Sequence, residues 1–250
     1  MEIEPTGPAR FDVPLDVAKV QTAGRYNSGF IVVGVVLLAG SLAGLWAMLA
    51  TGFGSWFTVI LVGLFAVASL GLIVTSALRR RMLLLLVGRS ASACTITDDG
   101  ITLAGAPEIR WSDLEFVAVL NDRPRTNRLR SVPVFGWFGR LALKAGNGTI
   151  LCELAVRDGE ALQRRFADPA AARRVTLFGR WPDGTRRGVL PLLLDAVLSE
   201  ASTQDVVRAV FDAASAHHVP VVLHESTFEH YKWKAPLLDP KWPTTTTGDG

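Results

Sequence analysis

The sequence has 250 residues with 26 basic and 23 acidic side chains, and its mean hydropathy is +0.30. Soluble globular proteins seldom reach a positive mean hydropathy, which excludes an ordinary soluble domain over the whole length. From residue 79 onward the basic residues exceed the acidic ones by only four, a balance that argues against a nucleic-acid partner.

Two long apolar runs account for the high hydropathy. No charged residue lies between Arg25 and Arg79. Within this interval, residues 30–50 and 56–78 each contain the roughly 20 apolar residues that cross a bilayer as a helix. The link at residues 51–55, TGFGS, is too short to hold a domain. The runs therefore predict two transmembrane helices joined as a hairpin.

A cleaved signal peptide is the alternative interpretation of the first run. The leader before it is long and carries acidic residues, whereas a signal peptide begins with a short basic stretch. We therefore predict an uncleaved anchor, with an N-terminal segment at residues 1–28 and the hairpin at residues 29–78. Gly40 and Gly44 form a GxxxG motif, which favours packing of the two helices against each other over dimerisation.

The distribution of charge predicts the orientation of the hairpin. Arg79, Arg80 and Arg81 follow the second run, and the link between the runs carries no charge. Lys19 and Arg25 precede the first run. Because lysine and arginine concentrate on the cytoplasmic side of a membrane, we predict an inner-membrane protein with two spans and both termini in the cytoplasm.

The apolar hexad Met82–Val87 follows the three arginines and is too short to cross a bilayer. It forms either a turn of helix that packs the following domain onto the membrane or the first strand of that domain. Arg79, Arg80 and Arg81 would then lie at the inner headgroups, where they set the topology and can hold anionic lipid.

Residues 79–225 contain short apolar runs separated by turn residues, which is typical of a strand-rich domain. Strands are predicted in SACTIT, GITLAG, EIRW, EFVAVL and VPVVLHE. Residues 141–156 predict a hairpin that turns at Asn147 and Gly148. Residues 188–194 pair with residues 175–180 as a further hairpin or begin a helix. Both cysteines, at 94 and 152, are predicted to be free buried thiols, because the cytoplasm is reducing.

Helices are predicted in two parts of this region. Residues 158–174 read as one or two short helices. A longer helix begins at a cap formed by Ser202 or Thr203 and ends near Ala216. Residues 226–250 are rich in proline, lysine and threonine, which predicts a flexible C-terminal tail.

Residues 95–120, TITDDGITLAGAPEIRWSDLEFVAVL, resemble the opening of bacterial pleckstrin-homology-like (PH-like) domains, which often follow a pair of transmembrane helices. The resemblance rests on a strand that ends in Asp-Asp-Gly, a returning strand, and the run that contains Trp111 and Asp113. It implies a cytoplasmic α+β domain built as a small β-barrel or sandwich with a capping helix. In that family the tryptophan packs under the sheet, and the Ser-Asp pair turns the chain into the next strand.

The resemblance implies little about the rest of the domain. The helix at residues 203–216 resembles the helix that plugs the family's barrel. The helical segment at residues 158–174 departs from the family's strand order, which leaves open whether it is an insertion or the capping helix itself. Lipid-binding members carry basic residues in the first hairpin, whereas Asp98 and Asp99 lie there in this sequence, so phosphoinositide specificity is not implied.

The segment NDRPRTNRLRSVPVFGWFGR, at residues 121–140, is the candidate membrane-surface site. Four arginines lie in a predicted loop and are followed by Trp137 between two phenylalanines; they are Arg123, Arg125, Arg128 and Arg130. Arginines near an anionic leaflet and aromatic rings at the headgroup level both favour membrane contact. The alternative is a solvated loop that leads into a strand whose aromatic residues belong to the core.

No catalytic motif is present among the phosphate loop, GxSxG, HExxH, CxxC and strand-linked GxGxxG patterns, which predicts a non-catalytic protein without a cofactor. All four histidines lie within residues 217–230. His217, His218 and His224 are therefore weak candidates for metal ligands. Their spacing fits no standard site, so surface histidines and no metal are predicted.

The sequence as a whole predicts a non-catalytic integral inner-membrane protein whose cytoplasmic domain serves as a scaffold for other proteins. Its predicted partners are the lipid bilayer and another membrane protein, with anionic lipids as further ligands and no nucleic acid. One alternative is an anionic-lipid-binding or lipid-sensing module that uses the segment from Arg123 to Trp137. A second alternative is an enzyme with an unrecognised site.

Overall fold

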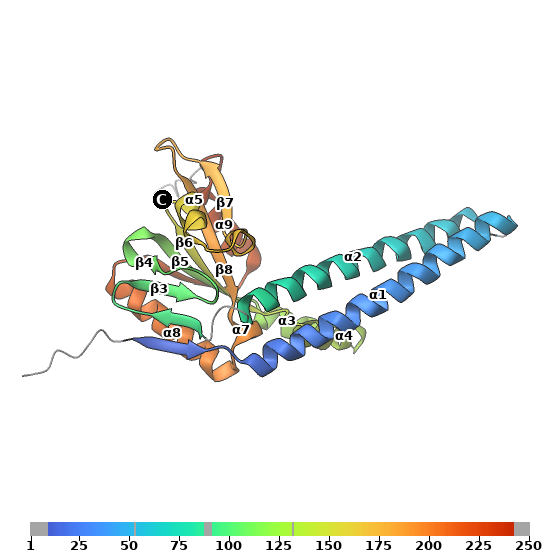
Figure 1. Cartoon of the computed structure of the whole chain (residues 1–250), viewed down its shortest axis with the longest axis horizontal. Helices are drawn as coiled ribbons and strands as arrows, with labels where there is room; N and C mark the ends of the chain where they lie inside the picture. Colours follow the sequence, from blue (N-terminus) through green and yellow to red (C-terminus); the bar gives the residue numbers. More distant parts are fainter. Residues whose placement is uncertain (1–9, 53, 88–91, 132, 243–250) are drawn as a thin grey trace, which may run out of the picture.

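The computed structural model describes residues 10–52, 54–87, 92–131 and 133–242. A long helical hairpin projects from one side of an α+β domain (Figure 1). The hairpin consists of α1 (Val17–Thr51) and α2 (Trp56–Val87), which pack along each other. The carboxylate of Asp16 caps α1 by accepting a 2.9 Å hydrogen bond from the amide of Lys19, and Gly52 ends the helix with a φ of 64°.

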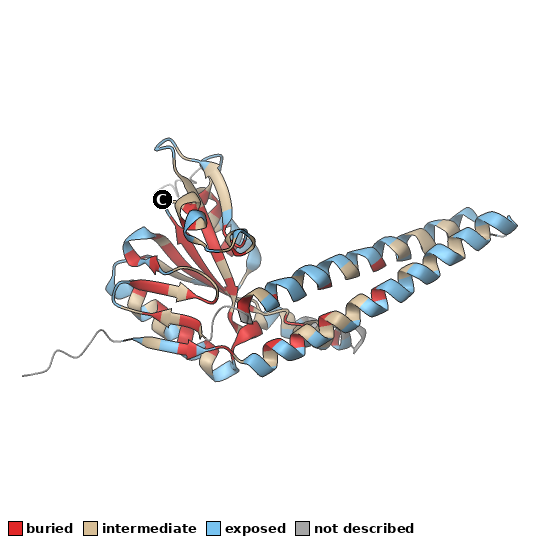
Figure 2. Ribbon diagram, viewed as in Figure 1, coloured by how far each residue is buried: buried red, intermediate tan, exposed pale blue. Residues whose placement is uncertain are grey.

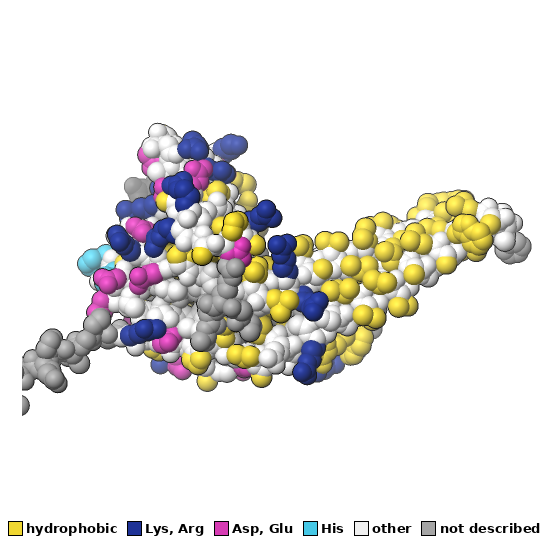
Figure 3. Space-filling model, viewed as in Figure 1, with side chains coloured by type: hydrophobic (Ala, Val, Ile, Leu, Met, Phe, Trp, Pro, Cys, Tyr) yellow, Lys and Arg dark blue, Asp and Glu magenta, His cyan; other side chains and the backbone are white. Residues whose placement is uncertain are grey.

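Both helices of the hairpin are long and apolar enough to cross a membrane. Only 6% of the most apolar window in α1 is buried, and 11% of the corresponding window in α2, so neither is the core helix of a soluble domain. Figure 2 shows the hairpin mostly exposed, and Figure 3 shows hydrophobic side chains along its length with basic side chains near its base. An exposed apolar surface of this extent is stable in lipid rather than in water.

The helices extend beyond the predicted hairpin at the two ends that join the domain. α1 begins at Val17 rather than at residue 29, and α2 continues past the three arginines to Val87. Met82–Val87 is therefore helix and not a first strand. Leu83 and Leu86 are buried and belong to the core of the domain, so the hairpin and the domain share a hydrophobic core.

The closest approach of the two helices does not lie at the GxxxG motif. A Cβ atom added at Gly34 would lie 2.7 Å from Cγ1 of Ile73 and 3.2 Å from the carbonyl oxygen of Ser69. A Cβ atom at Gly40 would meet nothing within 4 Å, and one at Gly44 would make only an ordinary contact with Val62 at 3.9 Å. Gly34 is therefore the glycine that lets α1 and α2 approach each other.

The first sheet joins the segments on either side of the hairpin. It contains four antiparallel strands in the order β1-β2-β3-β4, with bounds Phe11–Pro14, Ser92–Ile96, Gly100–Leu103 and Ile109–Arg110. β1 precedes α1 and pairs with β2, which follows α2. Gly100 is required in β3, because a Cβ atom there would lie 2.3 Å from the carbonyl oxygen of Ile109.

The second sheet contains five strands in the order β7-β8-β6-β5-β9. Their bounds are Thr176–Arg180 for β7, Arg186–Leu193 for β8, Ile150–Val156 for β6, Leu114–Asn121 for β5 and Val221–His224 for β9. All pairs are antiparallel except β5 with β9, which is parallel. The described strands thus form two separate sheets, and the predicted barrel is not closed.

Among the described residues, the domain contains seven helices besides the hairpin. They are α3 (Arg123–Arg130), α4 (Pro133–Lys144), α5 (Gly159–Arg165), α6 (Pro169–Ala172), α7 (Leu194–Val197), α8 (Glu200–Ala216) and α9 (Thr227–Leu238). α8 packs on strands of both sheets and contributes Val206, Val210 and Ala214 to the larger core. Phe116 and Ala118 of β5 face the opposite way, in a second core that includes Leu238 of α9.

Several local predictions are confirmed. The Asp98-Asp99 turn joins two paired strands, and residues 158–174 contain the two short helices α5 and α6. Residues 188–193 lie in β8, and α7 begins at Leu194. Three others are wrong. Residues 141–144 end α4 instead of forming a strand, the cap of α8 is Ser199 rather than Ser202 or Thr203, and the predicted flexible tail from residue 226 contains α9.

Candidate functional site

The arginine-rich segment was predicted to be a loop, but it is helical. Arg123, Arg125 and Arg128 lie on α3, and Arg130 ends it with a side chain outside the described residues. The guanidinium group of Arg123 donates a 2.7 Å hydrogen bond to the carboxylate of Glu200, which ties α3 to α8. Arg125 and Arg128 are exposed, so the domain presents both of these basic groups to its surroundings.

α4 is an amphipathic helix that follows α3 after a short turn. Trp137 is 54% exposed, whereas the neighbouring Gly136 is buried. The side chains of Phe135 and Phe138 lie outside the described residues. The helix therefore presents at least one large aromatic ring on its exposed face.

The end of α4 is attached to α1 at the domain-side edge of the apolar run. The buried side-chain amide of Asn27 donates a 2.7 Å hydrogen bond to the carbonyl oxygen of Ala145, just after α4. The ammonium group of Lys144 lies 5.8 Å from the ring centroid of Tyr26. Because Tyr26 and Asn27 directly follow Arg25, the last charge before the apolar run, α4 lies beside the base of the hairpin (Figure 1).

The three consecutive arginines of α2 point to different surroundings. Arg79 is half-buried and lines a cleft of about 530 Å³ between α2 and the domain, which Arg174 also lines. Arg80 lines a groove of about 440 Å³ between α1 and α2, together with Arg25. Arg81 is exposed. The three arginines were predicted to lie together at the headgroups, whereas Arg79 and Arg80 line separate hollows.

Trp111 and Asp113 occupy the turn that connects the two sheets. Trp111 is 4% exposed, and its indole NH donates a 3.0 Å hydrogen bond to the carbonyl oxygen of Thr97. A single 3₁₀ turn, Trp111–Asp113, leads directly into β5. The carboxylate of Asp113 lies 3.6 Å from the guanidinium group of Arg165. Both residues therefore stabilise the connection between the two sheets.

The four histidines make different contacts. The ring of His217 stacks on Trp111 with centroids 5.2 Å apart, and His218 adopts a positive φ of 58° after α8. His224 lies on β9, where burial lowers the pKa of its imidazole. Among the described residues, which include all four histidines, no group of three or more ligand side chains could hold a metal ion.

A buried polar cluster that the sequence analysis missed fixes α9 on the second sheet. The carboxylate of Glu153 on β6 is hydrogen-bonded to Nε2 of His230 at 2.8 Å. Both of its oxygens also accept 2.7 Å hydrogen bonds from the ammonium group of Lys234. Burial alone would raise the pKa of Glu153, but the hydrogen bonds and the charge of Lys234 hold it below its usual range. His230 and Lys234 lie one helical turn apart, a spacing too common to mark the cluster in advance.

The comparisons with known proteins give no relative. No family model matches the chain, and no curated protein and no solved structure does so either. The PH-like resemblance of residues 95–120 therefore stays a prediction from the sequence.

The arrangement combines features that suit contact with a lipid surface. An exposed basic helix and an amphipathic helix lie beside two apolar helices, and two hollows at the base of the hairpin contain arginines.

The buried Arg174 was also missed, because nothing in the run AAARRV distinguishes it from the exposed Arg173.

Proposed function

We propose that this is a non-catalytic inner-membrane protein whose cytoplasmic domain lies against the inner leaflet and binds its anionic lipids through α3 and α4. The hairpin spans the membrane twice, and both termini are cytoplasmic. The observation that carries the proposal is the attachment of α4 to α1 beside Arg25, at the edge of the apolar run.

Geometry at the base of the hairpin supports this placement. Arg79 lies on α2 and Arg25 on α1, so both helices carry a positive charge where their apolar surface ends. Positive side chains favour the headgroups of the inner leaflet. A helix held at that level, with an exposed indole at Trp137, meets the region in which tryptophan rings are enriched.

The positive charge of α3 also contributes to binding of the anionic leaflet. Each arginine close to an anionic leaflet contributes about 1 kcal/mol to binding, and the effect weakens within a Debye length. Arg125 and Arg128 are exposed and available for this role. Arg123 contributes less, because its charge is already paired with Glu200.

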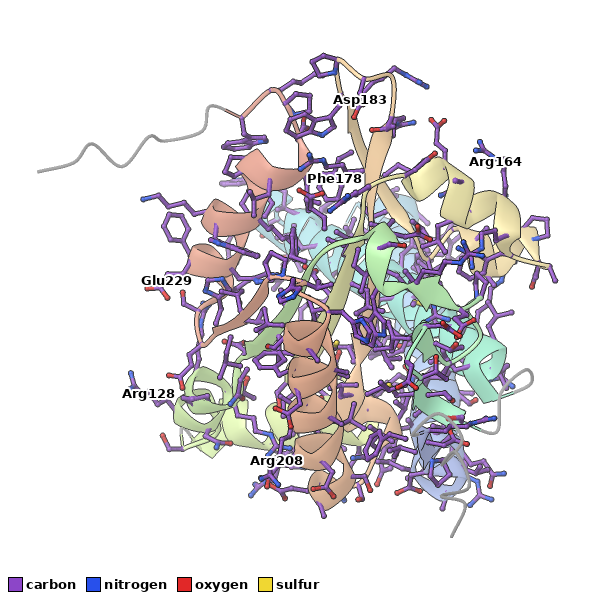
Figure 4. All side chains as sticks on the ribbon, turned by 90° about the vertical axis from the view of Figure 1, so that its left-hand side faces the viewer. Arg128, Arg164, Phe178, Asp183, Arg208 and Glu229 are labelled. Carbon is purple, nitrogen blue, oxygen red and sulfur yellow. The ribbon has the colours of Figure 1, made fainter. Side chains whose placement is uncertain are left out.

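Hydrogen exchange on the full chain in nanodiscs tests the proposal. We expect the amides of residues 123–144 to be better protected in nanodiscs that contain phosphatidylglycerol than in phosphatidylcholine alone, and high salt should reduce the difference. The variant R125E/R128E should lose the difference. R164E is the matched control, because Arg164 is exposed on α5 on the opposite side of the domain from Arg128 (Figure 4). Equal protection in both lipids would contradict the proposal.

A second candidate function is the protein-protein scaffold that the sequence predicts. It is favoured by the exposed apolar side chains at the β9 edge of the second sheet, where Leu223 is 54%, Phe228 74% and Tyr231 50% exposed. A photo-crosslinking residue at position 228, compared with one at position 164, tests it in native membranes. A specific membrane-protein adduct at 228 alone supports this function, and identical labelling at both positions opposes it.

We also propose kinship with PH-like domains. The supporting features are the buried Trp111, the turn at Asp113 and the position of α8 against both sheets. The separation of the strands into two sheets is the main departure from the expected barrel. An experimental structure in which the strands of both sheets form one continuous ladder would support the kinship.

A further inference from the structure

The cleft between α2 and the domain has the composition of a site for an amphiphilic ligand. One wall is the cytoplasmic part of α2, with Leu78, Met82 and Leu86, and the opposite wall is β8 and α7, with Leu192, Leu193 and Val197. Its volume of about 530 Å³ falls within the range of about 300–1,000 Å³ that is usual for small-molecule sites. A mostly apolar cleft with a few polar groups is typical of such sites.

The cleft is continuous with the part of α2 that crosses the membrane. Thr75 and Leu78 line it within the apolar run, and Leu86 lines it near the end of the helix. At 1.5 Å per residue, the lining follows α2 for about 16 Å from Thr75 to Leu86. A chain that lies in the bilayer beside Thr75 can therefore extend into the cleft without crossing water.

Arg174 is the buried charge of this cleft and lacks a partner of opposite sign. Its residue is 8% exposed, and one terminal nitrogen donates a hydrogen bond to the carbonyl oxygen of Ala104. Its Nε is buried without a hydrogen-bond partner, and no carboxylate of the described residues forms an ion pair with it. Burial lowers the pKa of this guanidinium group to about 10.

An unpaired buried charge is costly, and a bound anion would compensate for it. A planar guanidinium group is well suited to a phosphate or carboxylate, with which it forms charge-assisted hydrogen bonds. Arg79, which lines the same cleft, adds a second positive charge on the membrane side. The cleft therefore offers hydrocarbon-lined walls together with a positive group, the two features of a site for an acidic lipid.

We infer that this cleft binds one anionic phospholipid of the inner leaflet, with its phosphate on Arg174 and one acyl chain along Leu78, Met82 and Leu192. The inference rests on the proposed placement in the membrane, but it does not involve α3 or α4. A lipid held in this way would fasten the domain to α2 at a defined position. The site is distinct from the surface contact, because it takes a single molecule rather than a leaflet.

Native mass spectrometry of the full chain tests this site. The protein is purified from nanodiscs of equal phosphatidylglycerol and phosphatidylcholine, and the lipid that remains bound is identified. We expect one retained phosphatidylglycerol in the natural chain and in R173Q, the control at the exposed neighbouring arginine. R174Q should reduce retention on the order of ten- to hundredfold, the effect of losing a charge-assisted hydrogen bond, and R174K should restore part of it.

A second variant protects the test against misfolding of R174Q. Met82 is 46% exposed and lines the cleft, so M82W should obstruct the site of the lipid acyl chain while leaving Arg174 in place. L84W is its control, because Leu84 is exposed on the same helix and lines the groove against α1 instead. M82W should lose the retained lipid, and L84W should keep it.

Three results would overturn the inference: equal retention of the two lipids, retention by R174Q at the natural level, or displacement of the retained lipid by inorganic phosphate or oleate alone. The outcome is separable from that of the proposed function. R125E/R128E should leave the retained lipid unchanged, and R174Q should leave the lipid-dependent protection of residues 123–144 unchanged.

Discussion

The hydroxyl group of Thr95 donates a 2.9 Å hydrogen bond to the carboxylate of Asp12 across the pairing of β1 with β2. These residues lie on opposite sides of the hairpin in sequence, so the domain is assembled from the segments before and after it. Ser92 donates a further hydrogen bond to the same carboxylate, and this bond, opposed by burial, helps to hold the pKa of Asp12 below its usual range. β1 is thus an integral strand of the domain.

Truncation of the side chain of Leu15 should therefore destabilise the domain, although it lies before the first span. Leu15 is 6% exposed and belongs to the main core. Replacing a buried leucine with alanine typically costs about 2–5 kcal/mol, so L15A should lower the thermal midpoint of the full chain. Val17 is 45% exposed, and V17A should leave the midpoint nearly unchanged. Equal midpoints for L15A and the natural chain would show that the link between β1 and α1 does not pack in the core.

Substitution of Gly34 should weaken the packing of α1 against α2. A side chain there would collide with Ile73 and with the backbone of Ser69, whereas the same side chain at Gly40 would enter open space. G34L should therefore unfold at lower SDS concentration than the natural chain, as followed by far-UV circular dichroism, and G40L should not. If G40L unfolded at a lower SDS concentration than G34L, the GxxxG glycines would be the ones that form the contact.

The polar cluster under α9 should make the stability of the domain depend on pH. The folded pKa of Glu153 lies below the unfolded value of about 4.3. Its contribution is therefore complete above that pH and is lost as the pH falls through the folded value. Breaking a buried charge pair typically costs about 3–5 kcal/mol, so E153Q should lower the thermal midpoint at neutral pH by several degrees.

His224 should also make the domain less stable as the pH falls, but over a higher pH range than Glu153. Its folded pKa is below the unfolded value of about 6.5, so stability should decline as the pH falls below that value. H224Q should flatten the decline in thermal midpoint between about pH 6.5 and pH 5. H218N, at an exposed position where a positive φ suits asparagine, is the control. An unchanged slope in H224Q would assign the decline to another group.

The two cysteines should resist alkylation in the folded chain. Burial raises the pKa of the Cys94 thiol to about 12, with a further contribution from the charge of Asp12, and burial also raises the pKa of Cys152. Because the thiolate is the reactive form, maleimide at pH 7.5 should label neither residue until the chain is denatured. Labelling of one thiol in the native state, detected by intact mass, would show that its strand opens.

The hairpin and much of the first sheet could be predicted because their signals are local. Continuous apolarity without charge marks α1 and α2, and the Asp-Asp-Gly turn marks the pairing of β2 with β3. The boundaries could not be predicted, because the arginines at 79–81 interrupt the apolar run without ending the helix. Charges at a membrane surface are compatible with a continuing helix, and packing of Leu83 and Leu86 in the domain stabilises it.

The errors at α4 and α9 have a common physical cause. Leu141 and Leu143 alternate with the smaller Ala142 and the charged Lys144, and the turn-forming Asn147 and Gly148 follow, so a strand hairpin was the local expectation. The bond from Asn27 to Ala145 and the contacts with α1 favour helix instead. Likewise, the composition after residue 226 suggested a tail, and the distant Glu153 supplies the partner that fixes α9. Such tertiary contacts are not visible in a local pattern.

The most direct test of the central claim is the environment of the junction between α3 and α4. Ser131 is exposed there, and because both natural cysteines are buried, S131C provides one accessible thiol for the environment-sensitive fluorophore NBD. In nanodiscs with phosphatidylglycerol, we predict blue-shifted NBD emission that R125E/R128E abolishes and R164E preserves. Emission that is the same in phosphatidylglycerol and phosphatidylcholine, and unaffected by R125E/R128E, would contradict the binding of anionic lipid by α3 and α4.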